Sequence, residues 1–368
     1  MDNLSNDTKK LIKIISKYYS NLEIDKITEN KFYMKLYNDI KKNLKKININ
    51  DIIIKKIDDK PTKYLKDNDF TSNNIKNNII EKLTHSYECI HENNIIIYFC
   101  KSKINNNPII LIHMFQIIKM LKILFKRVFM SQKIIYFETL EKKRFPDKIS
   151  ELGPNEVNSG LTFLNFHKNG EIILYRKEEI LKVLIHELIH SNLIDKQIVF
   201  SNQIKKFSNN FCVDYSILLN EAFTETYALI INLFYIHITC KFKKSYLNTM
   251  FENEIKYSNY ICSKIVNYYN IEKMSDVIKN NNLCKTNFPQ KTNVFSYYFL
   301  KNILIKNHMK LGPILSKNSI NYKLNNESAI EEIILLIMGT ISSLDENNTI
   351  LKKDLNKSLR LCLYEIKF

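Results

Sequence analysis

The chain of 368 residues contains no tryptophan, only five glycines and six prolines, and no apolar stretch suited to crossing a bilayer. The longest apolar segment, residues 108–130, is interrupted by lysines, and the apolar residues 228–240 are too few for a membrane span. The N-terminal segment MDNLSNDTKKLIKIISKYY also lacks the apolar run of a signal peptide. These absences favour an intracellular protein without a membrane span.

Cysteine is scarce as well. The seven cysteines form no CxxC pair, and their number is odd. A small secreted scaffold would show a denser, even set, so we expect reduced thiols rather than a disulfide framework.

Basic residues outnumber acidic residues by 55 to 38, which gives a formal net charge of +17. Such a charge is typical of proteins that bind nucleic acid or an anionic surface. The lysines are spread along the whole chain, however, together with many asparagines and isoleucines, and no nucleic-acid-binding motif stands out. This composition indicates an A+T-rich genome, as in some large DNA viruses, and leaves a functional basic surface as the alternative.

The pattern of apolar residues divides the chain into three segments, and we expect an α+β protein. Residues 1–92, rich in lysine and asparagine, predict a helical appendage. Residues 93–200 predict four strands and two helices, and residues 201–368 predict an all-helical part, with a cleft between these two. The predicted strands cover residues 94–101, 133–139, 159–166 and 171–176.

The motif HELIH places His186 and His190 four residues apart in a mainly apolar helix. Residues i and i+4 share one helix face, so both imidazoles can bind one metal ion. Catalytic zinc uses three protein ligands and leaves a position for water. Glu187 lies about 100° around the helix from His186, which suits it to act as a general base on that water. An exposed or internally hydrogen-bonded helix remains the alternative.

The segment LLNEAFTETYALI supplies a third ligand. Glu221 and Glu225 are four residues apart among apolar neighbours, which argues against a solvated surface pair. Glu221 would bind the metal, and Glu225 would accept the second N–H of a ligating histidine. The metzincin arrangement does not apply, because Leu193 and Lys196 stand where it requires a glycine and a histidine.

Together, HELIH and NEAFTE resemble the gluzincin metallopeptidases, which include the thermolysin-like enzymes and related aminopeptidases. The resemblance implies a two-lobed zincin-like fold, with Glu187 as the general base and Glu225 behind a ligating histidine. It implies Zn²⁺ bound by His186, His190 and Glu221. The segments VNSGLT, YRKEEILKVLIHELIHSN and FSYYFLK are similar to uncharacterised metallopeptidase-like proteins of large DNA viruses, and the resemblance covers roughly residues 94–305.

The chain departs from the gluzincin pattern in two respects. The stretch between His190 and Glu221 is longer than in thermolysin-like enzymes, so we expect an extra loop at residues 196–212. No aminopeptidase motif of the GxMEN type precedes the helix. Gluzincins also stabilise the oxyanion with a tyrosine or histidine of the lower lobe. The candidates are Tyr227, His237, Tyr297 and Tyr298, of which we favour Tyr297 and Tyr298; core packing and a hairpin turn account for His113 and His167.

We therefore predict an intracellular, zinc-dependent peptidase that hydrolyses a peptide or protein substrate, in the host cytoplasm or the virion if the protein is viral. The alternative is a basic nucleic-acid- or protein-binding module with a structural or inactive zinc site. We expect the two metal-binding helices to lie side by side on the floor of the cleft. We also expect residues 171–176 to form an edge strand that pairs with an extended substrate, and a central position of this strand in its sheet would contradict the peptidase interpretation.

Overall fold

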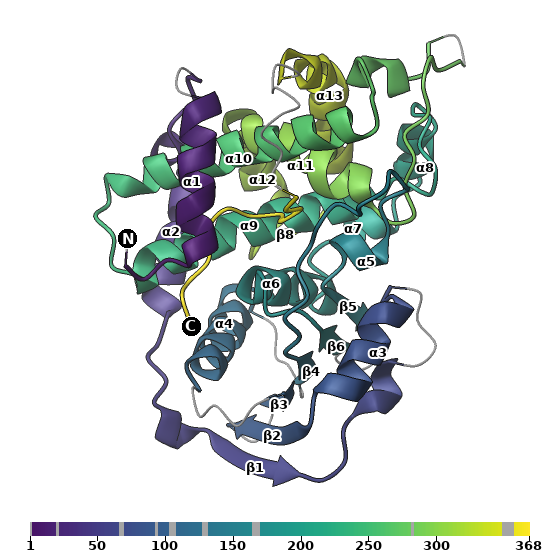
Figure 1. Cartoon of the computed structure of the whole chain (residues 1–368). Helices are drawn as coiled ribbons and strands as arrows, with labels where there is room; N and C mark the ends of the chain where they lie inside the picture. The colour runs from purple at the N-terminus through teal and green to yellow at the C-terminus, as the bar shows by residue number, and fades with distance from the viewer. Residues whose placement is uncertain are drawn as a thin grey trace.

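The computed structural model describes residues 2–19, 22–65, 70–92, 95–102, 108–126, 132–163, 170–280, 283–347 and 357–368. Helices and one mixed sheet form an α+β architecture, as predicted (Figure 1). The sheet occupies the lower part of the view in Figure 1, and most of the helices that follow it in sequence lie above it.

The main sheet has six strands in the order β1-β2-β3-β4-β6-β5. Strand β4 runs parallel to β3 and β6, and the other neighbouring pairs are antiparallel. The strands are β1 (Ile53–Ile57), β2 (His85–His91), β3 (Ile95–Lys101), β4 (Gln132–Phe137), β5 (Gly160–Phe163) and β6 (Glu171–Leu174). A separate hairpin consists of β7 (Ser319–Ile320) and β8 (Lys323–Leu324).

Both faces of the sheet are covered at the central strand β4. Successive side chains of a strand point to opposite faces, and those of β4 enter two different cores. Ile134 and Tyr136 of β4 belong to the main core, together with buried residues of α4 (Ile109–Leu124) and α6 (Ile180–Ser191). Ile135 and Phe137 belong to a second core that includes buried residues of α3 (Asn73–Lys82). The sheet therefore fixes the position of α6, the helix that carries HELIH.

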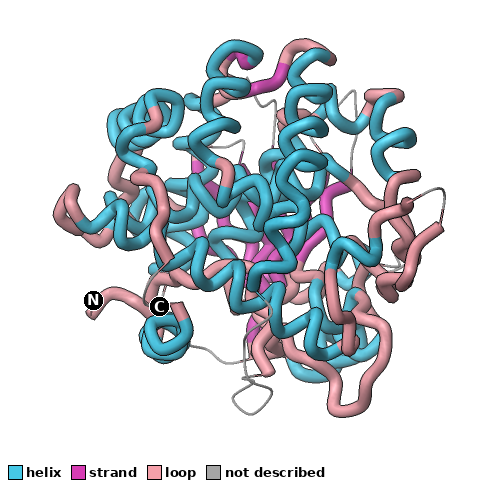
Figure 2. Tube along the Cα trace, turned by 90° about the horizontal axis from the view of Figure 1, so that it is seen from above, coloured by secondary structure: helices cyan, strands magenta, loops and turns pink. Residues whose placement is uncertain are grey.

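Helices α2 and α9 pack against α4 and α6, and most of the remaining helices pack above them; Figure 2 shows the helices covering the strands from above. The helices not named above are α1 (Asn6–Tyr18), α2 (Lys31–Asn43), α5 (Pro154–Val157), α7 (Lys196–Val199), α8 (Gln203–Ser208), α9 (Leu219–Thr239), α10 (Tyr246–Tyr268), α11 (Lys301–Lys306), α12 (His308–Asn318) and α13 (Ser328–Thr340). A π-helical turn, η5 (Phe295–Leu300), precedes α11. None of the helices in the described part of the chain is both long and apolar enough to span a membrane.

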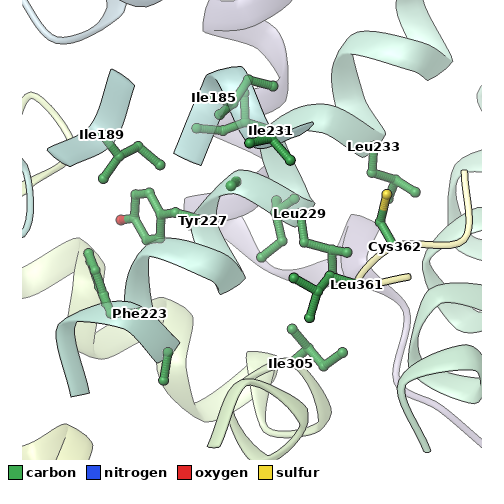
Figure 3. Close-up of a cluster of buried hydrophobic side chains, with 14 of the residues drawn as sticks. Ile185, Ile189, Phe223, Tyr227, Leu229, Ile231, Leu233, Ile305, Leu361 and Cys362 are labelled. Atoms are coloured by element: carbon green, nitrogen blue, oxygen red, sulfur yellow. The ribbon is translucent and has the colours of Figure 1, made fainter. Parts of the chain in front are cut away.

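The C-terminal segment, residues 357–368, is mostly buried although it forms no helix or regular strand. It brings the two chain ends together, because Leu4 and Ile366 form an isolated β-bridge. Leu361 and Cys362 of this segment lie among apolar side chains that include Leu233 of α9 and Ile305 of α11 (Figure 3). The segment is thus part of the core rather than a surface tail.

The prediction that residues 171–176 form an edge strand is wrong. Strand β6 pairs with β4 on one side and with β5 on the other, so β5 is the edge. The reason is visible in the burial of β6: Ile172, Ile173 and Leu174 are all buried. A continuous apolar run is typical of a strand covered on both faces and flanked by neighbours, whereas edge strands alternate more.

Four other expectations also differ from the structure. Strands β1 and β2 belong to the main sheet, although residues 1–92 were expected to be helical. The short helices α7 and α8 occupy most of the expected loop at residues 196–212. The β7–β8 hairpin interrupts the part expected to be all-helical. Cys212 and Cys284 form a disulfide, contrary to the expectation of reduced thiols, and the five other cysteines are free.

Candidate metal centre

Helices α6 and α9 pack side by side and supply the three predicted ligands. Both helices are apolar on nearly every face and almost completely buried, which is typical of helices inside a core. His186 and His190 lie on the face of α6 that meets the first turn of α9, where Glu221 is located. The arrangement predicted from HELIH and NEAFTE therefore brings three ligand side chains together from two adjacent helices.

The three ligand atoms form a nearly equilateral triangle. The Nε2 atoms of His186 and His190 are 3.1 Å apart, and they lie 3.3 and 3.4 Å from Oε2 of Glu221. An ion with tetrahedral ligands at about 2.0–2.1 Å separates its ligand atoms by about 3.3–3.4 Å. The spacing of these three atoms therefore matches one face of a tetrahedral metal site.

Hydrogen bonding and chemistry support the same assignment. Oε2 of Glu221 is buried and has no hydrogen-bond partner, although a buried carboxylate oxygen is normally paired. Two imidazole nitrogens that face each other and an acceptor oxygen have lone pairs to offer to a cation. The group of His186, His190 and Glu221 can accordingly hold a metal ion.

Each histidine is oriented by a carboxylate on its other ring nitrogen. Nδ1 of His186 lies 3.0 Å from Oε2 of Glu225, as the sequence predicted. Nδ1 of His190 lies 2.8 Å from Oδ2 of Asp195. Such carboxylates fix the tautomer that leaves Nε2 free for the metal and increase the basicity of the ring.

Asp195 was missed in the sequence because it lies beyond the end of α6. Leu193 adopts a left-handed conformation with φ of 54°, and the N–H of Ile194 donates to the carbonyl of Ile189. This cap reverses the chain and returns Asp195 to His190. Asn220, the residue before Glu221, donates to Oδ2 of Asp195 at 3.4 Å. The sequence signal that could have identified Asp195 is a carboxylate a few residues after the second histidine of the motif.

A buried lysine continues the chain of contacts behind His186. Nζ of Lys182 lies 2.5 Å from Oε1 of Glu225, and both side chains are almost fully enclosed. Burial alone would raise the pKa of the Glu225 carboxyl, but Lys182 and His186 hold it well below its usual value. Lys182 precedes His186 by four residues, so it shares the face of α6 that carries the ligand.

Glu187 lies beside the three ligands and is not one of them. Its Oε2 accepts a hydrogen bond of 2.7 Å from Oγ1 of Thr162 in the edge strand β5. A Cβ atom added to Gly160 would lie 3.0 Å from Oε1 of Glu187, so the glycine allows the strand to approach this closely. Burial raises the pKa of the Glu187 carboxyl, and the two histidines offset this only in part.

The two favoured tyrosines have different surroundings. Tyr297 lines a small cavity together with His186 and Glu187, and its ring centroid is 6.1 Å from that of His186. The hydroxyl of Tyr298 points elsewhere and donates to the carbonyl of Leu359 at 2.6 Å. Tyr297 belongs to the π-helical turn η5, and π-helical turns are frequent at functional sites.

The remaining candidates lie in other surroundings. Tyr227 stacks on Phe223 in the apolar cluster of Figure 3. The ring of His237 contacts the hydroxyl of Tyr37 and the carbonyl of Lys243. His113 pairs with Tyr235, and burial lowers its pKa to about 4. His167 lies outside the described residues.

A fourth protein ligand is not found among the described residues. Cys212 was the one cysteine considered able to fold back toward the site, but it is bonded to Cys284. The metal group in the described part of the chain comprises two histidines and one glutamate. Comparisons with models of known families, with curated protein sequences and with solved structures found no match.

Proposed function

We propose that this chain is a zinc-dependent peptidase with a two-lobed, zincin-like architecture. One observation carries the proposal: the buried carboxylate of Glu187 lies next to three convergent metal ligands and does not join them. A structural zinc site is normally closed by four protein ligands and has no use for such a carboxylate. Hydrolysis requires both an open position on the metal and a nearby base.

Zinc is the metal that we infer from the ligand set. Two neutral imidazoles and one carboxylate are ligands of catalytic zinc sites, whereas calcium and magnesium prefer oxygen ligands. When bound, zinc supplies Lewis acidity, which lowers the pKa of water and polarises a carbonyl group. Glu225 and Asp195 would keep His186 and His190 in the tautomer required for binding.

The edge strand β5 is suited to bind an extended peptide. The carbonyl of Ser159 accepts the N–H of Tyr175 across the β5–β6 pair. Hydrogen-bonded and non-hydrogen-bonded positions alternate along an antiparallel pair, so the backbone groups of Gly160 and Thr162 point away from β6. A peptide that pairs with this edge would pass next to Glu187, because Thr162 and Gly160 both contact it. The role expected of residues 171–176 thus moves to β5.

Glu187 and Tyr297 would have different roles in the hydrolysis. Glu187 would take the proton from the attacking water, and its hydrogen bond from Thr162 would hold the carboxylate toward the substrate. The same carboxyl would later deliver that proton to the leaving amine. Tyr297, which lines the same cavity, would donate a hydrogen bond to the oxygen that becomes negatively charged.

A peptide library tests the proposal. The library would be incubated with three samples: the protein as purified, the protein after removal of metal by a chelator, and the protein after reloading with Zn²⁺. Mass spectrometry would identify new peptide termini. We expect cleavage that disappears on chelation and returns with zinc. Zinc-loaded protein that stays folded and produces no new termini would overturn the peptidase assignment.

A further inference from the structure

A small cavity adjoins the Glu187 side of the metal centre. Its volume is about 30 Å³, which is room for about two water molecules, since one water requires about 10–15 Å³ by the same measure. The residues that form its walls come from six separate parts of the chain, and the charged side chains Lys143, Lys182 and Glu225 are among them. The walls also include Val157, Ser159, Gly160, Val183, Tyr297 and Leu361.

Leu361 belongs to the C-terminal segment, and its backbone is fixed at both ends. Its N–H donates to Oε1 of Glu179 at 2.8 Å, and its carbonyl accepts from Nζ of Lys301 at 3.0 Å. Oε1 of Glu179 also accepts the N–H of Cys362 at 2.6 Å. Glu179 and Lys301 are both buried, so these are charge-assisted hydrogen bonds in a protein interior. The wall that Leu361 forms is therefore held in place.

The other walls are equally constrained. Val183 lies within α6, between the N-terminal turn and the ligand His186. Gly160 is packed so closely that an added Cβ would lie 3.0 Å from the carbonyl oxygen of Ile173. A substrate side chain that enters the cavity thus has space for a few atoms only, and a larger one must displace a packed wall.

We propose that Leu361 sets an upper limit on the substrate side chain beside Glu187, so that the enzyme cleaves peptides with glycine, alanine or serine at that position. This inference rests on the proposed peptidase function. An isobutyl or aromatic group would overfill the cavity. Discrimination of one methylene in such a pocket is about 10–200-fold, so we expect at least about tenfold preference for the small residues.

The test compares Leu361→Ala with Leu359→Ala. Both leucines are buried in the same segment, but only Leu361 lines the cavity. In a library that varies each position around the cleaved bond, wild-type protein and Leu359→Ala should require a small residue at one position. Leu361→Ala should accept leucine or methionine there with at most about twofold penalty. Thermal melting confirms that both variants are folded.

A binding series separates this inference from the peptidase function. Hydroxamic acids bind zinc directly, and calorimetry measures their affinity for zinc-loaded protein without any turnover. The affinity should fall as the substituent grows from methyl to isobutyl and benzyl in the wild type, and Leu361→Ala should restore the larger ones. Equal affinity for all sizes in the wild type would overturn the size limit, even if peptides are cleaved. Size-dependent binding without any peptide cleavage would support the cavity and overturn the peptidase assignment.

Discussion

Buried charges gather in two adjoining regions, and their hydrogen bonding differs. The first is the metal centre, with His186, His190 and Glu221. The second, here called the C-terminal belt, is the contact of residues 357–368 with the buried side chains Glu179, Glu254 and Lys301. In the belt, the carboxylates accept backbone N–H groups at 2.6–3.1 Å. Oε2 of Glu179 in the belt and Oε2 of Glu221 in the metal centre both lack a hydrogen bond, but the first lies 2.9 Å from Nζ of Lys143, whereas the second faces two imidazole nitrogens.

The difference distinguishes a structural use of buried charge from a ligand site. Residues 357–368 have no regular secondary structure, and those of their buried N–H and C=O groups that lack a backbone partner need side-chain partners inside the protein. Glu179, Glu254 and Lys301 provide them. At the metal centre, two imidazole nitrogens and a carboxylate oxygen converge from α6 and α9. A lysine offsets the charge of Glu179 in the belt, whereas the converging ligand atoms of the metal centre can hold a metal ion in the corresponding place.

The largest expected effect is loss of the metal from the centre alone. The double variant His186→Ala/His190→Ala leaves one protein ligand, so zinc should fall from one ion per chain to none, measured by plasma emission spectrometry after dialysis. The C-terminal belt should remain intact, and hydrogen exchange of the Leu361 and Leu363 amides should stay slow. Full zinc occupancy in the double variant would place the metal elsewhere.

The next prediction tests whether Glu187 acts as a general base or as a metal ligand. Glu187→Gln keeps the shape of the side chain and the contact with Thr162 but removes the base. We expect zinc affinity to stay within about threefold and the rate of peptide cleavage to fall about 10²–10⁴-fold, the usual contribution of a general base. Loss of zinc together with activity would mean that Glu187 is a ligand.

The sequence predicted the metal centre better than the belt for a physical reason. HELIH and NEAFTE are local patterns, and helix periodicity alone aligns His186 with His190 and Glu221 with Glu225. The helices α4, α6, α9 and α10 and the strands β3 to β6 were also predicted, because their apolar runs are long. Strands β1 and β2 were missed, since their lysines and polar residues conceal the alternation.

Contacts between distant segments were not predictable in the same way. Asp195 reaches His190 through a left-handed turn at Leu193, a residue type that gives no turn signal. The pairing of Glu179 and Glu254 with the C-terminal segment joins residues more than a hundred positions apart. The choice of β5 as the edge depended on the spatial order of the strands, which the order in the sequence does not determine.

The pH dependence of stability should come from the belt. Burial raises the pKa of Glu254 to about 7, although the N–H groups of Leu363 and Tyr364 act in the opposite direction. In the unfolded chain the pKa is near 4.5. Both states are protonated below about pH 4.5, so this group opposes folding increasingly as the pH rises from 4.5 to 7, by on the order of 3 kcal/mol in total.

Glu254→Gln removes this titrating group, so the free energy of unfolding should depend less on pH. Urea unfolding at pH 5 and pH 8 measures the difference, and the variant should lose less stability between these values than the wild type. Glu252→Gln is the matched control, because Glu252 is on the same helix but its side chain is 40% exposed. Zinc affinity should not change in either variant. The same pH dependence in all three proteins would contradict the assignment to Glu254.

The smallest expected effect concerns Lys182, which lies between the two regions. Its ammonium group neutralises Glu225 behind the ligand His186, whereas Lys143 pairs in the same way with Glu179 of the belt at 2.9 Å. Lys182→Met should release Glu225 from its position against His186 and weaken zinc binding by about 10–100-fold, as changes behind a ligand do. Lys143→Met removes an equally buried lysine whose ion pair is with Glu179 rather than with Glu225, so zinc affinity should change much less than in Lys182→Met while the protein becomes less stable to urea. Competition with a chelator of known affinity measures both variants, and Glu225→Gln in the Lys182→Met background should cause little further loss, because the two side chains act as one unit. Equal zinc affinities for Lys182→Met and Lys143→Met would mean that the buried charges form one structural network and that the metal centre is not electrostatically separate from the belt.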